Sequence, residues 1–265
     1  MGKPSGSRSL LPHEHGAYGQ IVMPLLCGLA LGHPGVAAWL LAAGAFLGFL
    51  SYEPLLVATG RRGRRVEEDH GMRARRLALW ILVPAASLAG AGFALSPPEA
   101  RWAAAVPPVL AAGIAILVWL EHERTVPGEL AVGVALSSAG FPVGVAAGAR
   151  PGAAAAAWLA WSLGFAAATL AVEVVLARSR APLRDPARDP GMPALGLVAL
   201  LQVTAVALAA VRLVPAPVPL AVAPMALSSL AVILLRIPAR KLKVVGWLAV
   251  CGSTATLAVL VATLR

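Results

Sequence analysis

Long apolar runs dominate the chain, and most are bounded by prolines, glycines or charged residues that are typical of turns. A helix that crosses a bilayer needs about 20 mostly apolar residues, with a range of about 17–25. Nine candidate runs cover residues 16–32, 36–58, 77–95, 102–120, 130–147, 153–176, 195–214, 218–235 and 244–264. Eight is the alternative number, because Pro24 interrupts the first run and only residues 214–217 separate the seventh run from the eighth. The pattern predicts an all-α, polytopic membrane helix bundle in which residues 1–265 form a single transmembrane domain.

The composition excludes a water-soluble domain. Hydrophobic residues make up 59% of the chain and charged residues 13%, and the mean hydropathy is +0.80. A soluble domain carries about 25% charged residues, so this chain has too few polar groups to cover a globular surface. The same numbers exclude a disordered chain. A disulfide scaffold is excluded because the two cysteines, Cys27 and Cys251, both lie in apolar runs.

The basic residues predict an orientation in the membrane. With nine helices, eighteen of the 22 Lys and Arg residues lie in the N-terminal tail and alternate loops on one side, and four lie on the other. Basic residues in short loops mark the cytoplasmic side, so the N-terminus is predicted to be cytoplasmic and the C-terminus external. The cytoplasmic segments are then the tail 1–15 and the basic loops 59–76 and 177–194. Their basic clusters contact anionic lipid head groups, so the net charge of +10 requires no nucleic acid partner.

The acids and histidines gather on the same predicted side. Eleven of the twelve Asp and Glu residues lie there, as do four of the five His residues, with Glu99 and His33 as the exceptions. The rule for basic residues does not explain this, because acids contribute little to it. Either the short external loops have little room for polar residues, or a polar site faces the cytosol.

Glu53 is the most informative of these acids. It lies in an apolar run, eight residues before Arg61, which places it roughly 12 Å inward of that arginine on a helix. A charge in mid-helix costs about 2.5–3.5 kcal/mol on insertion, so Glu53 is expected to face the bundle interior, to be paired or to be protonated. Pro54 removes a backbone hydrogen bond and is expected to kink the helix beside it, as in the wall of a cavity.

Two other acids lie near predicted helix ends. Glu173 lies five residues before Arg178, where it is either a second acid of the site or the partner of that arginine in a surface ion pair. Glu129 opens the fifth predicted helix, and a carboxylate at a helix N-terminus contributes about 0.3–1 kcal/mol. For Glu129 the helix-end interpretation is the stronger one.

A second polar segment, His13-Glu14-His15, directly precedes the first predicted helix. In an extended chain the two histidines point the same way, as metal ligands do, but on a helix they diverge. No cysteine supports a zinc site, and the spacing alone is weak evidence for one. A polar plug that contacts Glu53 or Glu173 is the preferred interpretation.

Asp185 and Asp189 are four residues apart in the basic loop 177–194. On a helix they could share a divalent cation. Each is followed by a proline and neighboured by an arginine, so a loop with local Arg–Asp pairing is the preferred interpretation and a metal site the weaker one. The chain contains no phosphate-binding glycine loop and no Ser/His/Asp pattern of a hydrolase.

Residues 12–28 resemble the opening signature of the YwiC-like family of bacterial membrane proteins. That signature is close to P-x-E-H-G-A-W, followed by an apolar V-P and a glycine; here it reads PHEHGAY, with Tyr18 where tryptophan is usual. Glu123-Arg124-Thr125 is similar to the family's E-R-T stretch, and residues 240–247 are similar to the basic start of its last helix. The resemblance covers most of the chain and implies a bacterial cytoplasmic (inner) membrane protein, without implying an activity.

A more distant likeness is to the UbiA-type intramembrane prenyltransferases, which are nine-helix bundles with a cytoplasmic N-terminus. In them, two aspartate-rich motifs hold magnesium and a prenyl diphosphate beneath the loops that follow helices 2 and 6. Single carboxylates, Glu53 and Glu173, stand at those positions here, unless Asp185 and Asp189 substitute. Because a magnesium diphosphate needs several carboxylates, magnesium is expected only if that chemistry is retained.

The predicted function is binding of an isoprenoid, quinone or porphyrin-like molecule in a cytosol-facing cavity, with or without an altered prenyl transfer. Glu53 and Glu173 are the candidate catalytic residues. The candidate ligand contacts are His13, Glu14, His15, Tyr18, Tyr52, Glu129, Arg61, Arg65 and Arg124, since arginines bind phosphate groups well. The alternatives are a noncatalytic membrane subunit or assembly factor and, less favoured, a proton-coupled transporter that uses Glu53. Broken helices at matching positions in two halves would support the transporter, and the sequence shows few.

Overall fold

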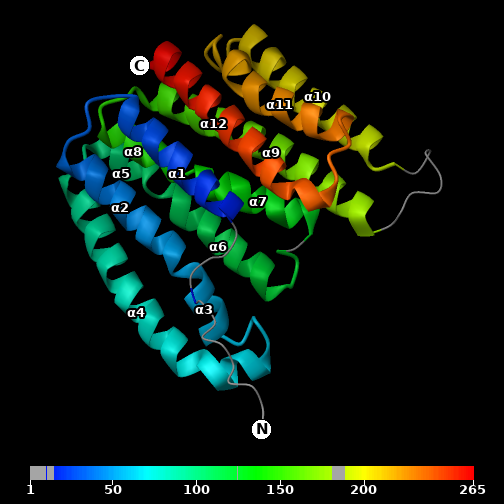
Figure 1. Cartoon of the computed structure of the whole chain (residues 1–265). Helices are drawn as coiled ribbons and strands as arrows, with labels where there is room; N and C mark the ends of the chain where they lie inside the picture. Colours follow the sequence, from blue (N-terminus) through cyan, green and yellow to red (C-terminus); the bar gives the residue numbers. More distant parts are fainter. Residues whose placement is uncertain (1–9, 11–14, 124, 181–188) are drawn as a thin grey trace.

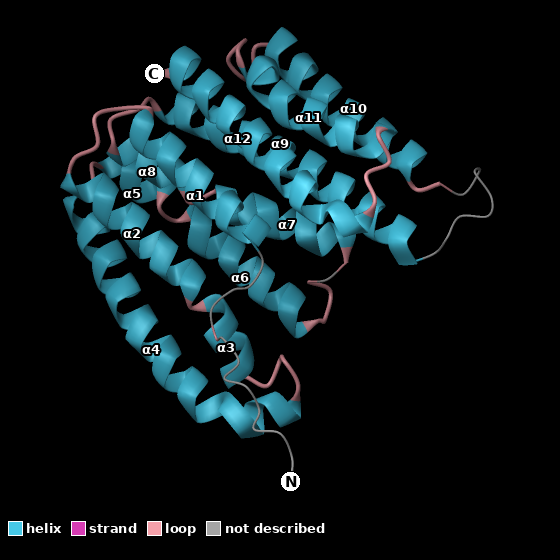
Figure 2. Ribbon diagram, viewed as in Figure 1, coloured by secondary structure: helices cyan, strands magenta, loops and turns pink. Residues whose placement is uncertain are grey.

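The computed structural model describes residues 10, 15–123, 125–180 and 189–265 (Figure 1). Figure 2 shows helices joined by loops, and no strand, in this part of the chain. The helices are α1 (His15–Ala30), α2 (Val36–Leu50), α3 (Tyr52–Ala58), α4 (Arg64–Leu95), α5 (Pro98–Ala103), α6 (Val106–Trp119), α7 (Val126–Ser137), α8 (Gly140–Ala146), α9 (Pro151–Arg180), α10 (Gly191–Ala210), α11 (Val218–Leu234), the 3-10 turn η2 (Ala239–Lys241) and α12 (Leu242–Leu264). The all-α prediction is confirmed.

Each predicted apolar run contains helix. Seven helical stretches of the described residues are long and apolar enough to cross a membrane. They are Val36–Ala58, Arg64–Leu95, Pro98–Trp119, Val126–Ala146, Pro151–Arg180, Gly191–Ala210 and Ala239–Leu264. The first and eighth runs form shorter apolar helices, Gly16–Ala30 and Val218–Leu234. The chain is therefore a helical membrane protein, while nine crossings and their orientation stay predictions.

The second run is broken where the sequence places Pro54. Helix α2 ends at Leu50 and α3 begins at Tyr52, with Ser51 between them. Proline has no backbone N–H to donate to the carbonyl four residues earlier, which here is that of Leu50. The Ser51 hydroxyl donates to the Gly48 carbonyl at 2.6 Å and caps the end of α2. The break agrees with the predicted kink.

The predicted basic loops are shorter than expected. Only residues 59–63 form a loop after α3, because the chain is helical again from Arg64. An ion pair between Arg64 and Glu68, four residues apart, supports this first turn of α4, which runs for 32 residues or about 48 Å. Likewise α9 continues to Arg180 and α10 begins at Gly191, so the loop prediction for 177–194 is wrong at both ends.

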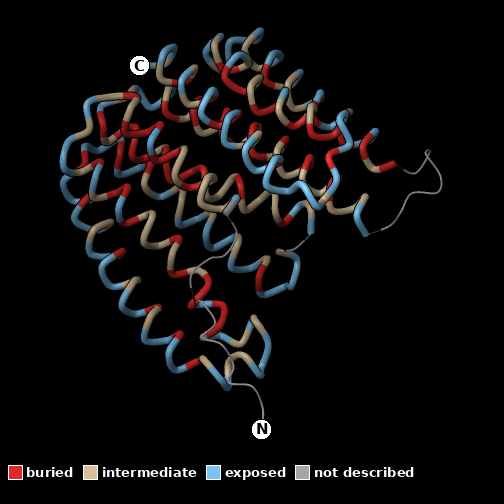
Figure 3. Tube along the Cα trace, in the orientation of Figure 1, coloured by how far each residue is buried: buried red, intermediate tan, exposed pale blue. Residues whose placement is uncertain are grey.

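Helix α9 lies in the middle of the bundle and packs against α1, α7, α8, α10, α11 and α12. Its Trp161 and Phe165 rings stack at 5.3 Å within the largest buried cluster, which also includes Cys27, Met225 and Leu260. Figure 3 shows buried residues along the inner helices and exposed residues along the outer side of α4. Tight packing of small and apolar side chains is what holds helices together in a membrane.

The helices α2, α3 and α4 form a hairpin on one side of the bundle. Helix α4 packs along both α2 and α3, and the hairpin joins the remaining helices chiefly through contacts of α2 with α8 and α1. Glycines allow α2 and α4 to approach closely: a Cβ on Gly44 would lie 2.8 Å from the Ala89 nitrogen. The loop of residues 59–63 joins α3 to α4 in this hairpin, and it contributes to the first candidate site.

Large apolar side chains cover the outside of the bundle, as expected for a surface in contact with lipid. Trp102 and Trp119 lie near the two ends of the α5–α6 stretch and are strongly exposed. Trp39, near the start of α2, and Trp247, near the start of α12, are also exposed. Tryptophans near helix ends are typical of residues at the membrane–water interface.

Candidate functional site

A buried ion pair joins α3 to the loop that follows it. Glu53 lies in the first turn of α3 and is 6% exposed. The Arg62 guanidinium donates from Nη2 to Glu53 Oε2 at 2.6 Å, and from Nε to Oε1 and Oε2 at 3.1 and 3.2 Å. Of the alternatives expected for Glu53, pairing is the one that the structure shows, and the partner comes from nine residues later in the chain.

Two glycines bring Arg62 back onto Glu53. Gly60 and Gly63 have φ angles of 73° and 103°, the left-handed region that glycine adopts without strain. The Arg61 N–H donates to the Leu56 carbonyl at 2.9 Å, and the Gly63 N–H donates to the Gly60 carbonyl at 2.9 Å. The resulting turn reverses the chain within residues 59–63, so the side chain of Arg62 reaches the first turn of α3.

The surroundings of Arg62 are negative. Burial alone lowers the pKa of its guanidinium, but the hydrogen bonds and charge of Glu53 outweigh burial and raise this pKa above its ordinary value. Tyr52 and Glu123 raise it further. Glu123 follows α6. Arg61, which precedes Arg62 in the α3–α4 loop, donates from Nη1 to the Trp119 carbonyl at the end of α6 (3.3 Å). Glu53, Arg62 and Glu123 therefore form one polar group, called the Glu53 cluster below.

The described part of the signature segment packs on α2, the helix that leads into α3. Tyr18 in α1 packs edge-to-face on Phe49 at the end of α2, with ring centroids 5.1 Å apart. On the N-terminal side of the segment, Leu10 is buried against Val57 of α3 and Ala74 of α4. Tyr18 thus contacts α2, while Leu10, which precedes the segment, contacts α3 and α4.

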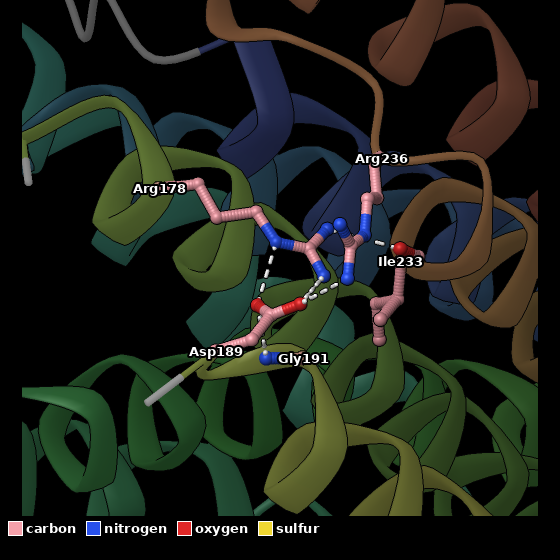
Figure 4. Close-up of polar contacts among 5 residues, drawn as sticks. All are labelled: Arg178, Asp189, Gly191, Ile233 and Arg236. Atoms are coloured by element: carbon pink, nitrogen blue, oxygen red, sulfur yellow. Dashed lines mark hydrogen bonds and ion pairs between the residues drawn. The ribbon is translucent and has the colours of Figure 1, made fainter. Parts of the chain in front are cut away.

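A second buried carboxylate lies in the other half of the chain (Figure 4). Arg178, near the end of α9, donates from Nε and Nη2 to the two oxygens of Asp189, each at 2.9 Å. Arg236, just after α11, donates from Nη2 to Asp189 Oδ2 at 3.2 Å, and the Gly191 N–H donates to Oδ1 at 3.0 Å. Arg178, Asp189 and Arg236 are called the Asp189 cluster below.

The Asp189 cluster ties three helices together. Arg178 also donates from Nη1 to the Ile233 carbonyl in α11 at 2.9 Å, so the same guanidinium contacts the start of α10 and the end of α11. Arg236 adopts a left-handed φ of 46°, which is unusual for a residue with a side chain. The hydrogen bonds from Arg178 and Gly191, together with both arginine charges, hold the pKa of Asp189 at about 2 despite its burial.

This environment favours an ion pair over a metal at Asp189. Both carboxylate oxygens already accept hydrogen bonds, and two guanidinium charges repel a cation. Among the described residues, no group of three or more His, Cys, Asp and Glu side chains could hold a metal ion. The preferred interpretation, Arg–Asp pairing, is right for Asp189, but its partners are Arg178 and Arg236 rather than neighbours in the loop. Asp185 lies outside the described residues.

Glu173 and Glu53 lie in helices that do not pack closely on each other. Helix α3 packs on α4 and α2, whereas Glu173 is half-buried in α9, which packs on α7, α10 and α11. The alternative pairing of Glu173 with Arg178 is wrong, because that arginine binds Asp189. Neither acid lines the small cavity between α1, α7 and α9 or the open hollow at the start of α4. The cavity shared by both stays a prediction.

The other predicted residues lie in several places. Glu129 is in the first turn of α7, whose N-terminal Thr125 hydroxyl accepts from the Gly128 N–H at 3.2 Å, in agreement with the helix-end interpretation. Tyr52 lies beside Glu53 at the start of α3, and Arg65 is exposed on α4. His15 is the first residue of α1. His13, Glu14 and Arg124 lie outside the described residues.

Sequence reasoning missed three residues of the two clusters. It chose Arg61 and Arg65 as ligand contacts, but Arg62 is the arginine that pairs with Glu53. The signal available was its position between Gly60 and Gly63, two residues that allow a sharp reversal of the chain. For Glu123 the signal was its place in the E-R-T stretch. No local signal points to Arg236, which lies 47 residues after Asp189.

The model of one protein family, described as YwiC-like protein, matches residues 11–143, which is half of the chain. The match includes the whole Glu53 cluster and ends before the Asp189 cluster. The searches of curated proteins and of solved structures find no match.

Proposed function

The chain belongs to the YwiC-like protein family, and from this premise we propose that it is an integral membrane protein that binds a lipophilic molecule by its polar end at the Glu53 cluster. The observation that carries the proposal is the buried ion pair between Glu53 in α3 and Arg62 in the α3–α4 loop. The pair lies within the matched half of the chain.

A structural role alone is a weak reason for such a pair. The two charges lose much of their hydration on burial, and well-packed apolar residues often stabilise a fold equally well. The pair also connects only α3 to its own following loop, so it adds little to the packing of the bundle. A carboxylate, a guanidinium and a second acid at the edge of an apolar bundle are suited to a ligand with a polar head and an apolar body, such as an isoprenoid, a quinone or a porphyrin-like molecule.

We propose binding rather than prenyl transfer as the principal activity. Transfer from a magnesium diphosphate needs several carboxylates around the metal ions. Glu53 is held by Arg62 and Asp189 by two arginines, so neither presents a free carboxylate to a cation. A magnesium-dependent reaction of the UbiA type would require carboxylates beyond these two.

The proposed orientation places the Glu53 cluster on the cytoplasmic side of a bacterial inner membrane, with the C-terminus external. The distribution of Lys and Arg residues supports this orientation. A cysteine introduced at the exposed Arg65 is expected to react with a membrane-impermeant thiol reagent only after the cells are opened. A cysteine at the last residue, Arg265, is expected to react in intact cells, and the reverse pattern would contradict the orientation.

Mass spectrometry of lipophilic molecules extracted from the purified protein tests the binding proposal. The variant Glu53→Gln/Arg62→Gln replaces both partners, so that neither charge stays buried without its counter-ion. The matched control is Arg64→Gln/Glu68→Gln, which removes an exposed pair of the same chemistry. We expect wild type and control to retain the same molecule and the double variant to retain about tenfold less, the effect of losing about 1.4 kcal/mol. Equal retention in all three proteins, or a wild type without any retained molecule, contradicts the proposal.

A noncatalytic subunit is the second candidate, because the α5–α6 stretch has a large uncovered surface. This stretch packs on α8 and α7 and is exposed over most of its length. If a protein partner covers it, Ala112→Trp on its exposed side is expected to release a partner that purifies in stoichiometric amount with wild type. Ligand retention at the Glu53 cluster is expected to remain unchanged in this variant, which separates the two functions.

A further inference from the structure

The fifth apolar run is broken inside the bundle. Helix α7 ends at Ser137 and α8 begins at Gly140, and both halves belong to one membrane-length stretch, Val126–Ala146. At the break, the Phe141 N–H donates to the Ser138 carbonyl at 3.0 Å, three residues earlier rather than four. Pro142 has no N–H to donate. Broken helices are tolerated at membrane depth where protein or water satisfies their polar groups.

A small cavity lies against this break. Its volume is about 10 Å³, which is room for about one water molecule. Ser137 and Gly140 line it from the break, Trp158 and Trp161 from α9, and Cys27 and Gly28 from α1. Because Ser137 is fully buried, the cavity has a hydroxyl group far from bulk solvent.

Trp161 brings an unpaired donor to the same place. Its side chain is 1% exposed and lines the cavity, and its Nε1 makes no well-formed hydrogen bond with the described residues, where the thiol of Cys27, a weak acceptor, lies beside it. The neighbouring Trp158 differs, because its Nε1 donates to the Val134 carbonyl at 3.1 Å. A buried donor without an acceptor costs about 1–3 kcal/mol. An N–H group also repels cations, so the group that completes this site is an acceptor.

We propose that this cavity is a binding site for one internal water molecule. The water accepts a hydrogen bond from the Trp161 indole N–H and donates one to the Ser137 hydroxyl oxygen. The Ser137 hydroxyl donates to the Val134 carbonyl at 3.0 Å and lies 3.2 Å from Ser162 Oγ, so an oxygen lone pair is left to accept from water. The water thereby connects the break in α7–α8 to the central helix α9. This site is separate from the Glu53 cluster and does not depend on the function proposed for it.

NMR of the tryptophan-labelled protein in nanodiscs tests the proposal, because each indole N–H gives its own signal. Trp161→Phe and Trp158→Phe assign the two signals of interest. We expect a cross-peak between the Trp161 indole proton and a long-lived water, and none for Trp158, whose proton is held by a carbonyl. Ser137→Ala is expected to abolish that cross-peak.

Ser138→Ala is the matched control for the serine variant. Ser138 is as deeply buried as Ser137 and likewise donates to a carbonyl three residues earlier, at 2.6 Å, but it does not line the cavity. The cross-peak is expected to persist in this control. Absence of the cross-peak in wild type overturns the proposal. If the Trp161 signal then shifts in Cys27→Ala, the thiol beside it is the acceptor instead of water.

Discussion

The Glu53 cluster and the Asp189 cluster are built from the same groups but connect different parts of the molecule. In each, a buried carboxylate accepts hydrogen bonds from a mostly buried arginine. Asp189 connects three helices through Arg178 and Arg236, whereas Glu53 connects α3 only to its own following loop. The Asp189 cluster lies outside the family match and the Glu53 cluster inside it. The comparison agrees with our proposal, in which the Asp189 cluster serves the fold and the Glu53 cluster a binding site.

Asp189→Asn is expected to have the largest effect. It leaves Arg178 without its counter-ion in a buried position, and breaking a buried pair in this way costs about 3–5 kcal/mol. The midpoint of thermal unfolding in detergent measures the loss. Glu68→Gln, at an exposed ion pair on α4, is the control and is expected to leave the midpoint nearly unchanged. If Asp189→Asn is as stable as this control, the Asp189 cluster does not stabilise the fold.

Glu53→Gln is expected to destabilise the protein less, by about 2 kcal/mol, because Arg62 keeps the attraction of the Glu123 carboxylate. The loss is expected to be local to residues 59–63. Limited trypsin digestion checks this by the rate of cleavage after Arg61 and Arg62, which should rise while cleavage elsewhere does not. If Glu53→Gln lowers the unfolding midpoint as far as Asp189→Asn does, the two clusters contribute equally to the stability of the fold.

Acid is expected to act on the Asp189 cluster through a defined pH range. The pKa of Asp189 is about 2 in the folded protein and about 3.9 in an unfolded chain. Because the folded pKa is the lower one, the stabilisation is complete above pH 4 and is lost as the pH falls toward 2. The difference in unfolding midpoint between wild type and Asp189→Asn should therefore shrink between pH 4.5 and pH 2.5. A difference that stays constant over this range would show that the carboxylate charge is not what stabilises the cluster.

Arg236 provides the smallest expected effect. Its side chain is 70% exposed, so Arg236→Gln is expected to cost about 0.5 kcal/mol, as for other exposed ion pairs. Arg236→Gly also loses the charge but relieves the left-handed backbone conformation, so its unfolding midpoint should lie above that of Arg236→Gln. The reverse order of the two midpoints would assign the role of Arg236 to its guanidinium rather than to the turn after α11.

Much of the fold follows from the sequence because apolar runs of membrane length have few alternatives to helix. The burial and pairing of Glu53 follow as well, since a charge in such a run needs a partner. The partner itself was missed, because the distance to Arg61 assumed a continuous helix and α3 ends at Ala58. Residues 64–76 were predicted to be a loop because they are rich in charged residues, although they belong to α4.

The contacts of the Asp189 cluster were harder to predict. Asp189 was expected to pair with arginines beside it in the loop, and Arg178 with Glu173. Both arginines of the cluster instead reach Asp189 from helix ends, and Arg236 does so only once α10 and α11 pack together. A carboxylate and its partner separated by 47 residues leave no periodic pattern along the chain. Tertiary packing decides such a pair, and local sequence does not.

The lengths of the helices determine how the protein responds to the thickness of its bilayer. Helix α1 has 16 residues, about 24 Å, which is shorter than a hydrocarbon core of about 30 Å. It is surrounded by α2, α7, α8, α9 and α12, so its short length is matched to protein rather than to lipid. Helix α4 lies on the outside, and most of its apolar part is exposed. A change in lipid chain length is therefore expected to act on the tilt of the outer hairpin before it acts on α1.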